Sequence, residues 1–179
     1  MFHISADRLC WIDNAEDDVN DLCLHGHAVA QIGTERFEYD ATVSATALYL
    51  LKSLTRDHLM GKEIQMLPCC GFFLCADEKQ EEVDIFGCPN GIDWTVCPRG
   101  DTVQIITASG KQTFIPMALY QKEVFRFADS IEAFYQKCSE KVLPTDPFDR
   151  DGYLIFWKEW HRRRGKHHTE PLADGRLNT

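Results

Sequence analysis

Residues 66–116 read MLPCCGFFLCADEKQEEVDIFGCPNGIDWTVCPRGDTVQIITASGKQTFIP, and this stretch decides the fold. Short apolar runs alternate in it with sequences that are typical of tight turns. Gly91 and Gly110 allow positive φ at two of these turns, while Pro89 and Pro98 fix φ and donate no hydrogen bond to a neighbouring strand. We therefore predict an antiparallel β-meander, with strands at 72–75, 83–86, 92–96, 102–107 and 112–115.

The segments on either side complete the predicted architecture. Residues 22–32 and 36–43 flank a short glycine-containing connection, which predicts an N-terminal β-hairpin. Apolar periodicity predicts a helix from Ser44, its N-cap, through 55 or beyond, a second over 119–138, and a third that carries aromatic residues at 153–160 and ends in the three arginines at 162–164. We expect one α+β domain over residues 1–164, with about six to seven strands including the hairpin, packed by about three helices. Residues 165–179 lack periodicity, so we expect a disordered tail.

Composition indicates a soluble globular protein. The chain has 179 residues, of which 44% are hydrophobic and 26% charged. No apolar run approaches the roughly 18 residues of a membrane span, and the first residues lack the cationic start and apolar centre of a signal peptide. We therefore expect a cytoplasmic protein without membrane association. In that compartment most of the eight cysteines would be reduced thiols.

The net charge of −9 is concentrated in the first part of the chain. Residues 1–100 carry 7 lysines and arginines against 17 aspartates and glutamates, whereas residues 101–179 carry 12 against 11. Such acidity repels phosphate backbones, so we expect no direct binding of nucleic acid. It suits a basic protein partner, although a solvated face that aids solubility is the alternative. The candidate partner-binding residues form two clusters: Asp13, Glu16, Asp17, Asp18 and Asp21, then Asp77, Glu78, Glu81 and Glu82.

Cys23, His25 and His27 form a candidate metal site. In a β-strand these three side chains would share one face, because side chains alternate with a period of two. Thiolate and imidazole are ligands that zinc accepts, and a catalytic zinc would also need a further protein ligand and an open position. The alternative is that this face is the solvent-exposed face of an amphipathic strand, whose apolar face carries Leu22 and Leu24.

The predicted meander holds further cysteines that lie close enough in sequence to share a structural zinc. None of them forms the C-x2-C pair that usually begins such a site. In extended backbone, adjacent cysteines also point apart. We interpret most of these residues as small buried apolar side chains, since a reactive cysteine needs an electropositive setting that the neighbouring sequence lacks. They are Cys69, Cys70, Cys75, Cys88 and Cys97.

The last predicted helix combines aromatic residues with Arg162, Arg163 and Arg164. Aromatic and cationic side chains together can build a nucleic-acid stacking surface or a protein hot spot, but the same spacing suits a stripe that faces the core. We assign the aromatic residues at 156, 157 and 160 to the core, and expect the basic segment to be solvated or paired with acidic groups of the first half. The common motifs of nucleotide-binding proteins, serine hydrolases and zinc proteases are absent from the sequence.

Two functional hypotheses follow, together with a structural alternative. The first is a small acidic interaction module, an inhibitor or immunity-type protein that blocks a basic partner and has no catalytic residues or cofactor. The second is a metal-binding protein or metal-dependent enzyme that uses zinc at Cys23, His25 and His27, with a further cysteine from the meander. The structural alternative is a subunit that docks into a larger assembly through a strand edge or the aromatic helix.

Overall fold

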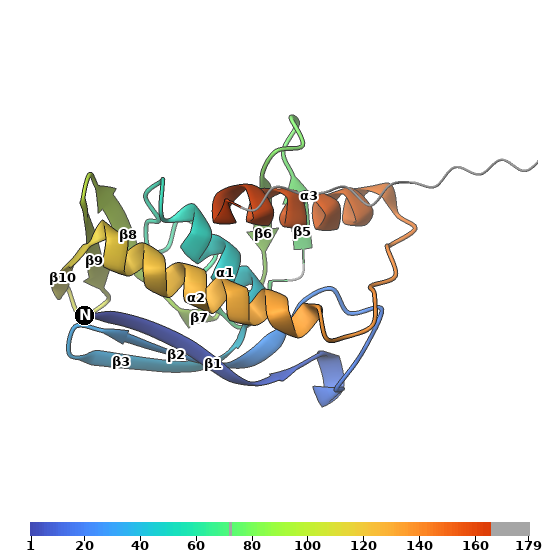
Figure 1. Cartoon of the computed structure of the whole chain (residues 1–179), viewed down its shortest axis with the longest axis horizontal. Helices are drawn as coiled ribbons and strands as arrows, with labels where there is room; N and C mark the ends of the chain where they lie inside the picture. Colours follow the sequence, from blue (N-terminus) through green and yellow to red (C-terminus); the bar gives the residue numbers. More distant parts are fainter. Residues whose placement is uncertain (72, 166–179) are drawn as a thin grey trace, which may run out of the picture.

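A computed structural model describes residues 1–71 and 73–165, except for the side chain of Asp13. In this part of the chain, ten strands pair in an antiparallel manner and combine with three α-helices, which confirms the α+β class (Figure 1). The expected six to seven strands were too few, because two strands, at 2–10 and 67–68, were not predicted and one predicted strand is divided in two. The strands are β1 (Phe2–Cys10), β2 (His25–Ile32), β3 (Glu35–Thr42), β4 (Leu67–Pro68), β5 (Phe73–Ala76), β6 (Val83–Phe86), β7 (Gly91–Ile92), β8 (Trp94–Arg99), β9 (Thr102–Thr107) and β10 (Gln112–Pro116).

The N-terminal sheet has the order β1-β2-β3. The predicted hairpin is present as β2 and β3, and Gly33 at its turn has a φ of 61° that favours glycine. The sequence also forms β1, which pairs with β2 from Phe2 opposite Ile32. Burial alternates along β2 and over the first three residues of β1, so that one face of the sheet contributes to the hydrophobic core.

The predicted meander strands are present but do not form one continuous sheet. Within residues 1–71 and 73–165, strands β8, β9 and β10 make a three-stranded sheet, while β5 with β6 and β4 with β7 make separate two-stranded sheets. The predicted strand over 92–96 is divided at Asp93, whose carboxylate accepts hydrogen bonds from the backbone N–H groups of Gly61 (3.0 Å) and Met66 (3.1 Å) and faces His58 Nε2 at 2.9 Å. These contacts turn the chain there, so the strands on either side join different partners.

Helix α1 (Val43–Lys52) is central to the core, and all ten of its residues are buried. A helix that is apolar on every side is stable only inside a protein. It begins one residue before Ser44, which is therefore not the N-cap: the Ser44 hydroxyl instead accepts a hydrogen bond from the backbone N–H of Leu24 (3.1 Å). None of the described helices combines the length and apolar character that crossing a membrane requires.

Helices α2 (Met117–Tyr135) and α3 (Pro147–Arg164) pack against α1, and α3 also covers β5 and β6 (Figure 1). Helix α3 begins well before the predicted start, because the Asp146 side chain accepts hydrogen bonds from two backbone N–H groups of its first turn and Pro147 fits the first helical position. Gly165 ends it with a left-handed φ of 74°. The predicted tail otherwise lies outside the described residues.

Candidate functional site

The first predicted acidic cluster lies in the segment between β1 and β2, beside the connection between α2 and α3. The Asp17 carboxylate accepts the backbone N–H of Ser139 (3.0 Å), and hydrogen bonds from the side chain and the backbone of Ser139 lower the pKa of Asp17. Asp21 accepts the backbone N–H groups of Ile12 and Cys23, so it shapes its own loop. Asp18 also accepts a local backbone hydrogen bond, whereas Glu16 is exposed. The cluster therefore combines loop-forming carboxylates with exposed charge.

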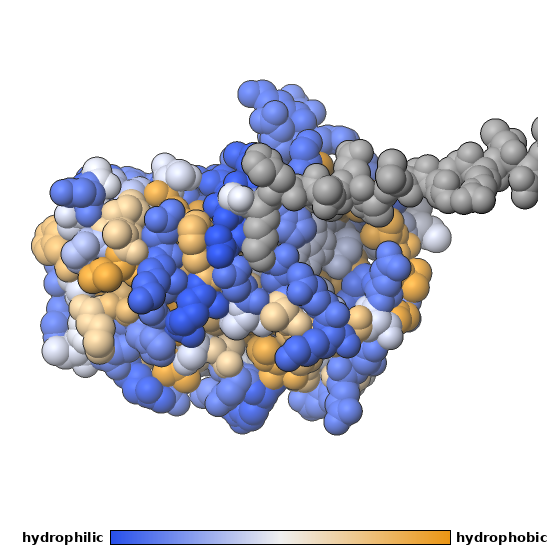
Figure 2. Space-filling view, in the orientation of Figure 1, coloured by the Kyte–Doolittle hydropathy of each residue, from blue (hydrophilic) through white to orange (hydrophobic). Residues whose placement is uncertain are grey.

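The second predicted acidic cluster occupies the tip of the β5–β6 hairpin, which Figure 2 shows as a hydrophilic projection. Asp77 accepts the backbone N–H groups of Glu81 and Glu82. Glu82 pairs with Arg162 (3.1 Å) and Arg163 (2.7 Å) of α3. Glu78 and Glu81 are exposed, and Figure 1 places this tip far from the segment that holds the first cluster. Part of the predicted acidic surface is therefore satisfied within the chain.

A cavity of about 390 Å³ opens where the first acidic cluster meets β5 and the start of α3. In the described part of the chain, its charged lining residues are Asp21 and Asp149, with no lysine or arginine among them. We call this cavity the acidic groove. Its lining residues are Asn20, Asp21, Leu22, Cys23, Phe73, Leu74, Pro144 and Asp149.

Exposed aromatic rings extend from the acidic groove across the β5–β6 hairpin. Phe73 and Phe148 have ring centroids 5.3 Å apart and are 47% and 44% exposed. Phe86, which is 55% exposed, lies directly opposite Phe73 in the β5–β6 register, on the same face of the hairpin. Figure 2 also shows hydrophobic surface at the right of the view, around the connection between α2 and α3. We call Phe73, Phe86 and Phe148 the aromatic face.

The structure does not bring Cys23, His25 and His27 together. Cys23 precedes β2 and is buried, with its thiol directed to the carbonyl oxygen of Gly71, and burial raises its pKa to about 12. His25 and His27 are half-buried on β2, where His27 Nδ1 lies 2.8 Å from the Asp40 carboxylate and His25 Nε2 lies 3.8 Å from Asp21. Because the strand begins at His25, the alternation that placed Cys23 on the same face does not extend to it.

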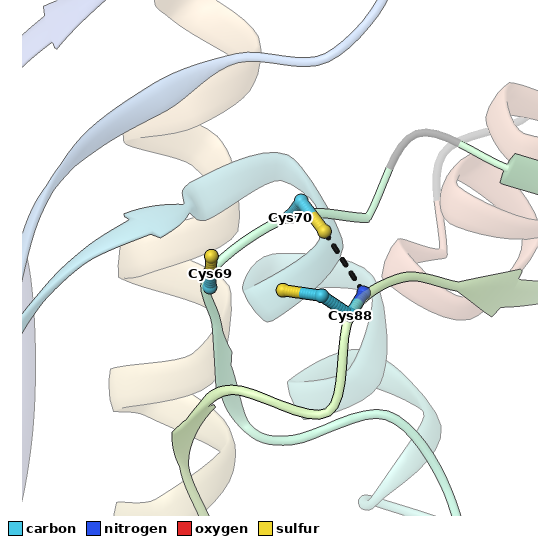
Figure 3. Close-up of side chains that lie close together, drawn as sticks. All are labelled: Cys69, Cys70 and Cys88. Atoms are coloured by element: carbon cyan, nitrogen blue, oxygen red, sulfur yellow. Dashed lines mark hydrogen bonds between the residues drawn. The ribbon is translucent and has the colours of Figure 1, made fainter.

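A different set of side chains does converge. Among the described residues, Cys69, Cys70 and Cys88 are the group of three potential metal ligands whose ligand atoms all lie within 4.8 Å of one another. Figure 3 shows Cys69 and Cys70 on the segment after β4, and Cys88 on the segment before β7 with its sulfur directed toward the other two. We call these three residues the thiol cluster. The predicted divergence of Cys69 and Cys70 fails because Cys69 lies in a bend beyond the end of β4.

The thiol cluster has distinct electrostatics at each sulfur. Interactions of the Cys88 sulfur with the thiols of Cys69 and Cys70, and with the backbone of Asn90, lower the pKa of Cys88 to about 7. The pKa of Cys69 is raised by its interaction with Cys88, and that of Cys70 by burial. A thiolate is the form of cysteine that binds metals and attacks electrophiles. Cys88 also lines a second cavity, of about 600 Å³, which extends to Tyr49 and Glu63.

No family model matches the sequence, and neither the curated proteins nor the solved structures include a significant match to it. Sequence reasoning identified Asp21 as a candidate binding residue, but it assigned most of the meander cysteines to the core and missed Asp149 and the aromatic face. The sequence signal for the aromatic face was a phenylalanine in each of the two predicted strands 72–75 and 83–86, namely Phe73 and Phe86.

Proposed function

We propose that this protein is a small cytoplasmic interaction module that binds a basic protein partner, in the manner of an inhibitor or immunity-type protein. The observation that carries the proposal is the aromatic face beside the acidic groove. Exposed aromatic side chains that contact each other are unusual on a surface with no partner, and aromatic residues are the commonest anchors at protein interfaces. A cavity next to them would receive a side chain of the partner.

The charge around the groove specifies the chemistry of that partner. The carboxylate of Asp149 has no hydrogen-bond or ion-pair partner within the described residues, and Asp21 lines the same cavity. A lysine or arginine of the partner could place its cationic end between these carboxylates while its aliphatic stem packs on Phe73. Glu16, Asp17 and Asp18 lie in the adjoining segment and would raise the encounter rate with a basic surface.

Direct binding of nucleic acid has less support than protein binding. The basic run at the end of α3 is already paired: Arg162 and Arg163 contact Glu82, and Arg164 contacts Asp129 at 2.7 Å. This pairing matches the expectation that the basic segment neutralises acidic groups, although Asp129 belongs to the second half of the chain. The cations are therefore not free to neutralise phosphates. A metal role for Cys23, His25 and His27 also has little support, because their ligand atoms do not converge.

Site-specific photo-crosslinking tests the proposal. A photoreactive residue at position 73 or 148 of the full-length chain, expressed in its own cells, should crosslink one and the same protein of basic isoelectric point. The matched control position is Phe114, which is 63% exposed on β10 at the other end of the molecule.

A double variant, Phe73→Ala with Phe148→Ala, should bind the crosslinked partner at least about 10-fold more weakly than the unmodified chain does. Equal crosslinking from position 114, a non-basic partner, or no discrete product would contradict the proposal.

A further inference from the structure

The thiol cluster has the dimensions of a metal site. A metal–sulfur bond of about 2.3 Å places the sulfurs around one bound ion about 4 Å apart. The three sulfurs already lie within 4.8 Å of one another. The spacing of the three sulfurs is therefore close to that of three ligands around one ion.

We propose that Cys69, Cys70 and Cys88 together bind one thiophilic metal ion, Zn²⁺ or Cu⁺, through their sulfur atoms. Sulfur ligands select soft ions over Mg²⁺ or Ca²⁺, which prefer oxygen. A set that contains only sulfur therefore fits these two ions best. This site uses none of Cys23, His25 and His27, the residues at which the sequence predicts a metal.

The backbone holds the two ligand-bearing segments in place before any ion binds. Strands β4 and β7 pair with Pro68 opposite Gly91, and the backbone N–H of Cys69 donates to the carbonyl oxygen of Asn90 (3.0 Å). At Gly87 a side chain would place a Cβ atom 2.1 Å from the carbonyl oxygen of Cys70, so only glycine permits this approach of the two segments. The ligands are thus preorganised, which reduces the entropy lost on binding.

Backbone N–H groups also support the sulfur atoms. The N–H of Cys88 donates to the sulfur of Cys70 at 2.9 Å, and the backbone of Asn90 and Cys70 interacts with the sulfur of Cys88. Such donors partly offset the negative charge that thiolates carry when they bind a metal. Outer hydrogen bonds of this kind orient the ligands and contribute to metal affinity.

Three protein ligands leave a coordination position open for a fourth group. Cys69 is exposed and Cys88 lines the cavity of about 600 Å³, so a water molecule or a small ligand can reach the ion from solvent. An ion held this way is exchangeable, unlike a closed structural zinc with four protein ligands. The inference is independent of the proposed partner binding, because the thiol cluster and the acidic groove share none of their residues.

Metal titration of the full-length protein tests the inference. The protein is reduced with a phosphine, which adds no competing thiol and is then removed because phosphorus also binds Cu⁺, and it is titrated without oxygen with Zn²⁺ or Cu⁺ against a coloured chelator. We expect one equivalent of at least one ion to bind. Cys88→Ser should reduce the affinity for that ion at least about 100-fold, since losing only an outer partner costs 10- to 100-fold. Cys75→Ser is the matched control, because Cys75 is a half-buried thiol of the neighbouring hairpin and should leave the affinity unchanged.

Alkylation of the unmodified chain provides a second readout that does not depend on the folding of a variant. The bound ion should slow the alkylation of Cys69, Cys70 and Cys88, measured by mass spectrometry of peptides, while Cys10 and Cys75 react as before. The proposal would be overturned if neither ion bound in stoichiometric amount, if Cys88→Ser kept the full affinity, or if Cys75→Ser lost as much. Equal protection of all five cysteines would also overturn it.

Discussion

At the scale of single residues, the contact between Gly152 and β5 determines how closely α3 approaches the hairpin. An added Cβ at Gly152 would lie 2.1 Å from the carbonyl oxygen of Leu74. Helix propensity alone predicts that Gly152→Ala stabilises the protein by about 1 kcal/mol. The steric contact predicts the opposite sign, a loss of about 1–3 kcal/mol in the free energy of unfolding, because α3 must move away from β5.

Urea denaturation of Gly152→Ala therefore distinguishes helix propensity from the steric contact with Leu74, because the two predict opposite signs for the change in the free energy of unfolding. Lys122→Ala at an exposed site of α2 serves as the control and should change stability by less than about 0.5 kcal/mol. A more stable Gly152→Ala protein would mean that α3 and β5 are less closely packed than in this structure. The same contact positions Phe148 beside Phe73, so the variant should also weaken partner binding.

Single residues also explain why the thiol cluster was not predicted. The turn Pro89-Asn90-Gly91 was visible in the sequence, but its partner segment was not, because β4 and β7 pair over only two residues each. The argument that Cys69 and Cys70 point apart assumed extended backbone, whereas Cys69 lies in a bend. The periodicity of a sequence predicts the direction of side chains only within helices and strands. The three cysteines lie in irregular segments, and long-range contacts that the local sequence does not reveal bring them together.

At the scale of secondary-structure elements, a buried ion pair joins α1, α3 and β6. Lys52 Nζ lies 3.2 Å from Glu159 Oε2, and both side chains are buried. Glu159 also accepts the backbone N–H of Val83 (2.8 Å) and the Arg163 Nε–H (2.6 Å), while Lys52 donates to the carbonyl oxygen of Val83. These bonds satisfy the backbone of β6 along the edge that β5 does not pair with, so the short hairpin does not expose that edge.

Removing Glu159 should therefore destabilise the protein strongly. Glu159→Ala leaves the buried Lys52 cation without its anion, which typically costs about 3–5 kcal/mol. Chemical denaturation measures the loss, and Glu140→Ala, at an exposed site after α2, is the control with an expected change near zero. A loss below about 1 kcal/mol in Glu159→Ala would show that water reaches the pair and that α3 packs more loosely on α1.

A second link between elements should depend on pH. The hydroxyl groups of Thr107 (2.7 Å) and Ser109 (2.8 Å) donate to the Glu35 carboxylate, which joins β3 to the β9–β10 turn and lowers the pKa of Glu35. A lowered pKa in the folded state means that the contribution to stability is complete above the ordinary value of about 4.5 and is lost as the pH falls through the folded value. At pH 6, the free energy of unfolding measured with urea should therefore be lower for Glu35→Gln than for the unmodified chain. This difference in stability should shrink below pH 4. A difference that stays constant with pH would exclude the charge as its cause.

Elements were predicted well where local signals are strong. The strands 83–86 and 102–107 and the longest helix are found close to their predicted positions, because turn residues and apolar periodicity are local properties. Strand β1 and the division of the meander at Asp93 were missed. Both depend on contacts with distant segments: β1 pairs with β2, and Asp93 binds the segment after α1.

At the scale of the whole molecule, the distribution of charge gives the two acidic clusters different roles. The first adjoins the acidic groove, and the second lies at the hairpin tip, where Glu82 is paired with the arginines of α3. Charge near a binding surface mainly changes the association rate, whereas buried aromatic anchors mainly change the dissociation rate. The two contributions can therefore be separated kinetically with the captured partner.

Matched pairs of neutralising variants make this separation. Glu16→Gln with Asp18→Asn, beside the groove, should lower the association rate by about 10-fold at low salt and flatten its salt dependence, with little change in the dissociation rate. Glu78→Gln with Glu81→Gln removes the same charge from the distant hairpin tip and should have a much smaller effect on the association rate. Phe73→Ala should instead speed dissociation, because it removes an anchor and leaves the long-range field unchanged. If both neutralised pairs slowed association equally, the net charge of −9 would steer the partner without regard to position, and the groove would have no special electrostatic role.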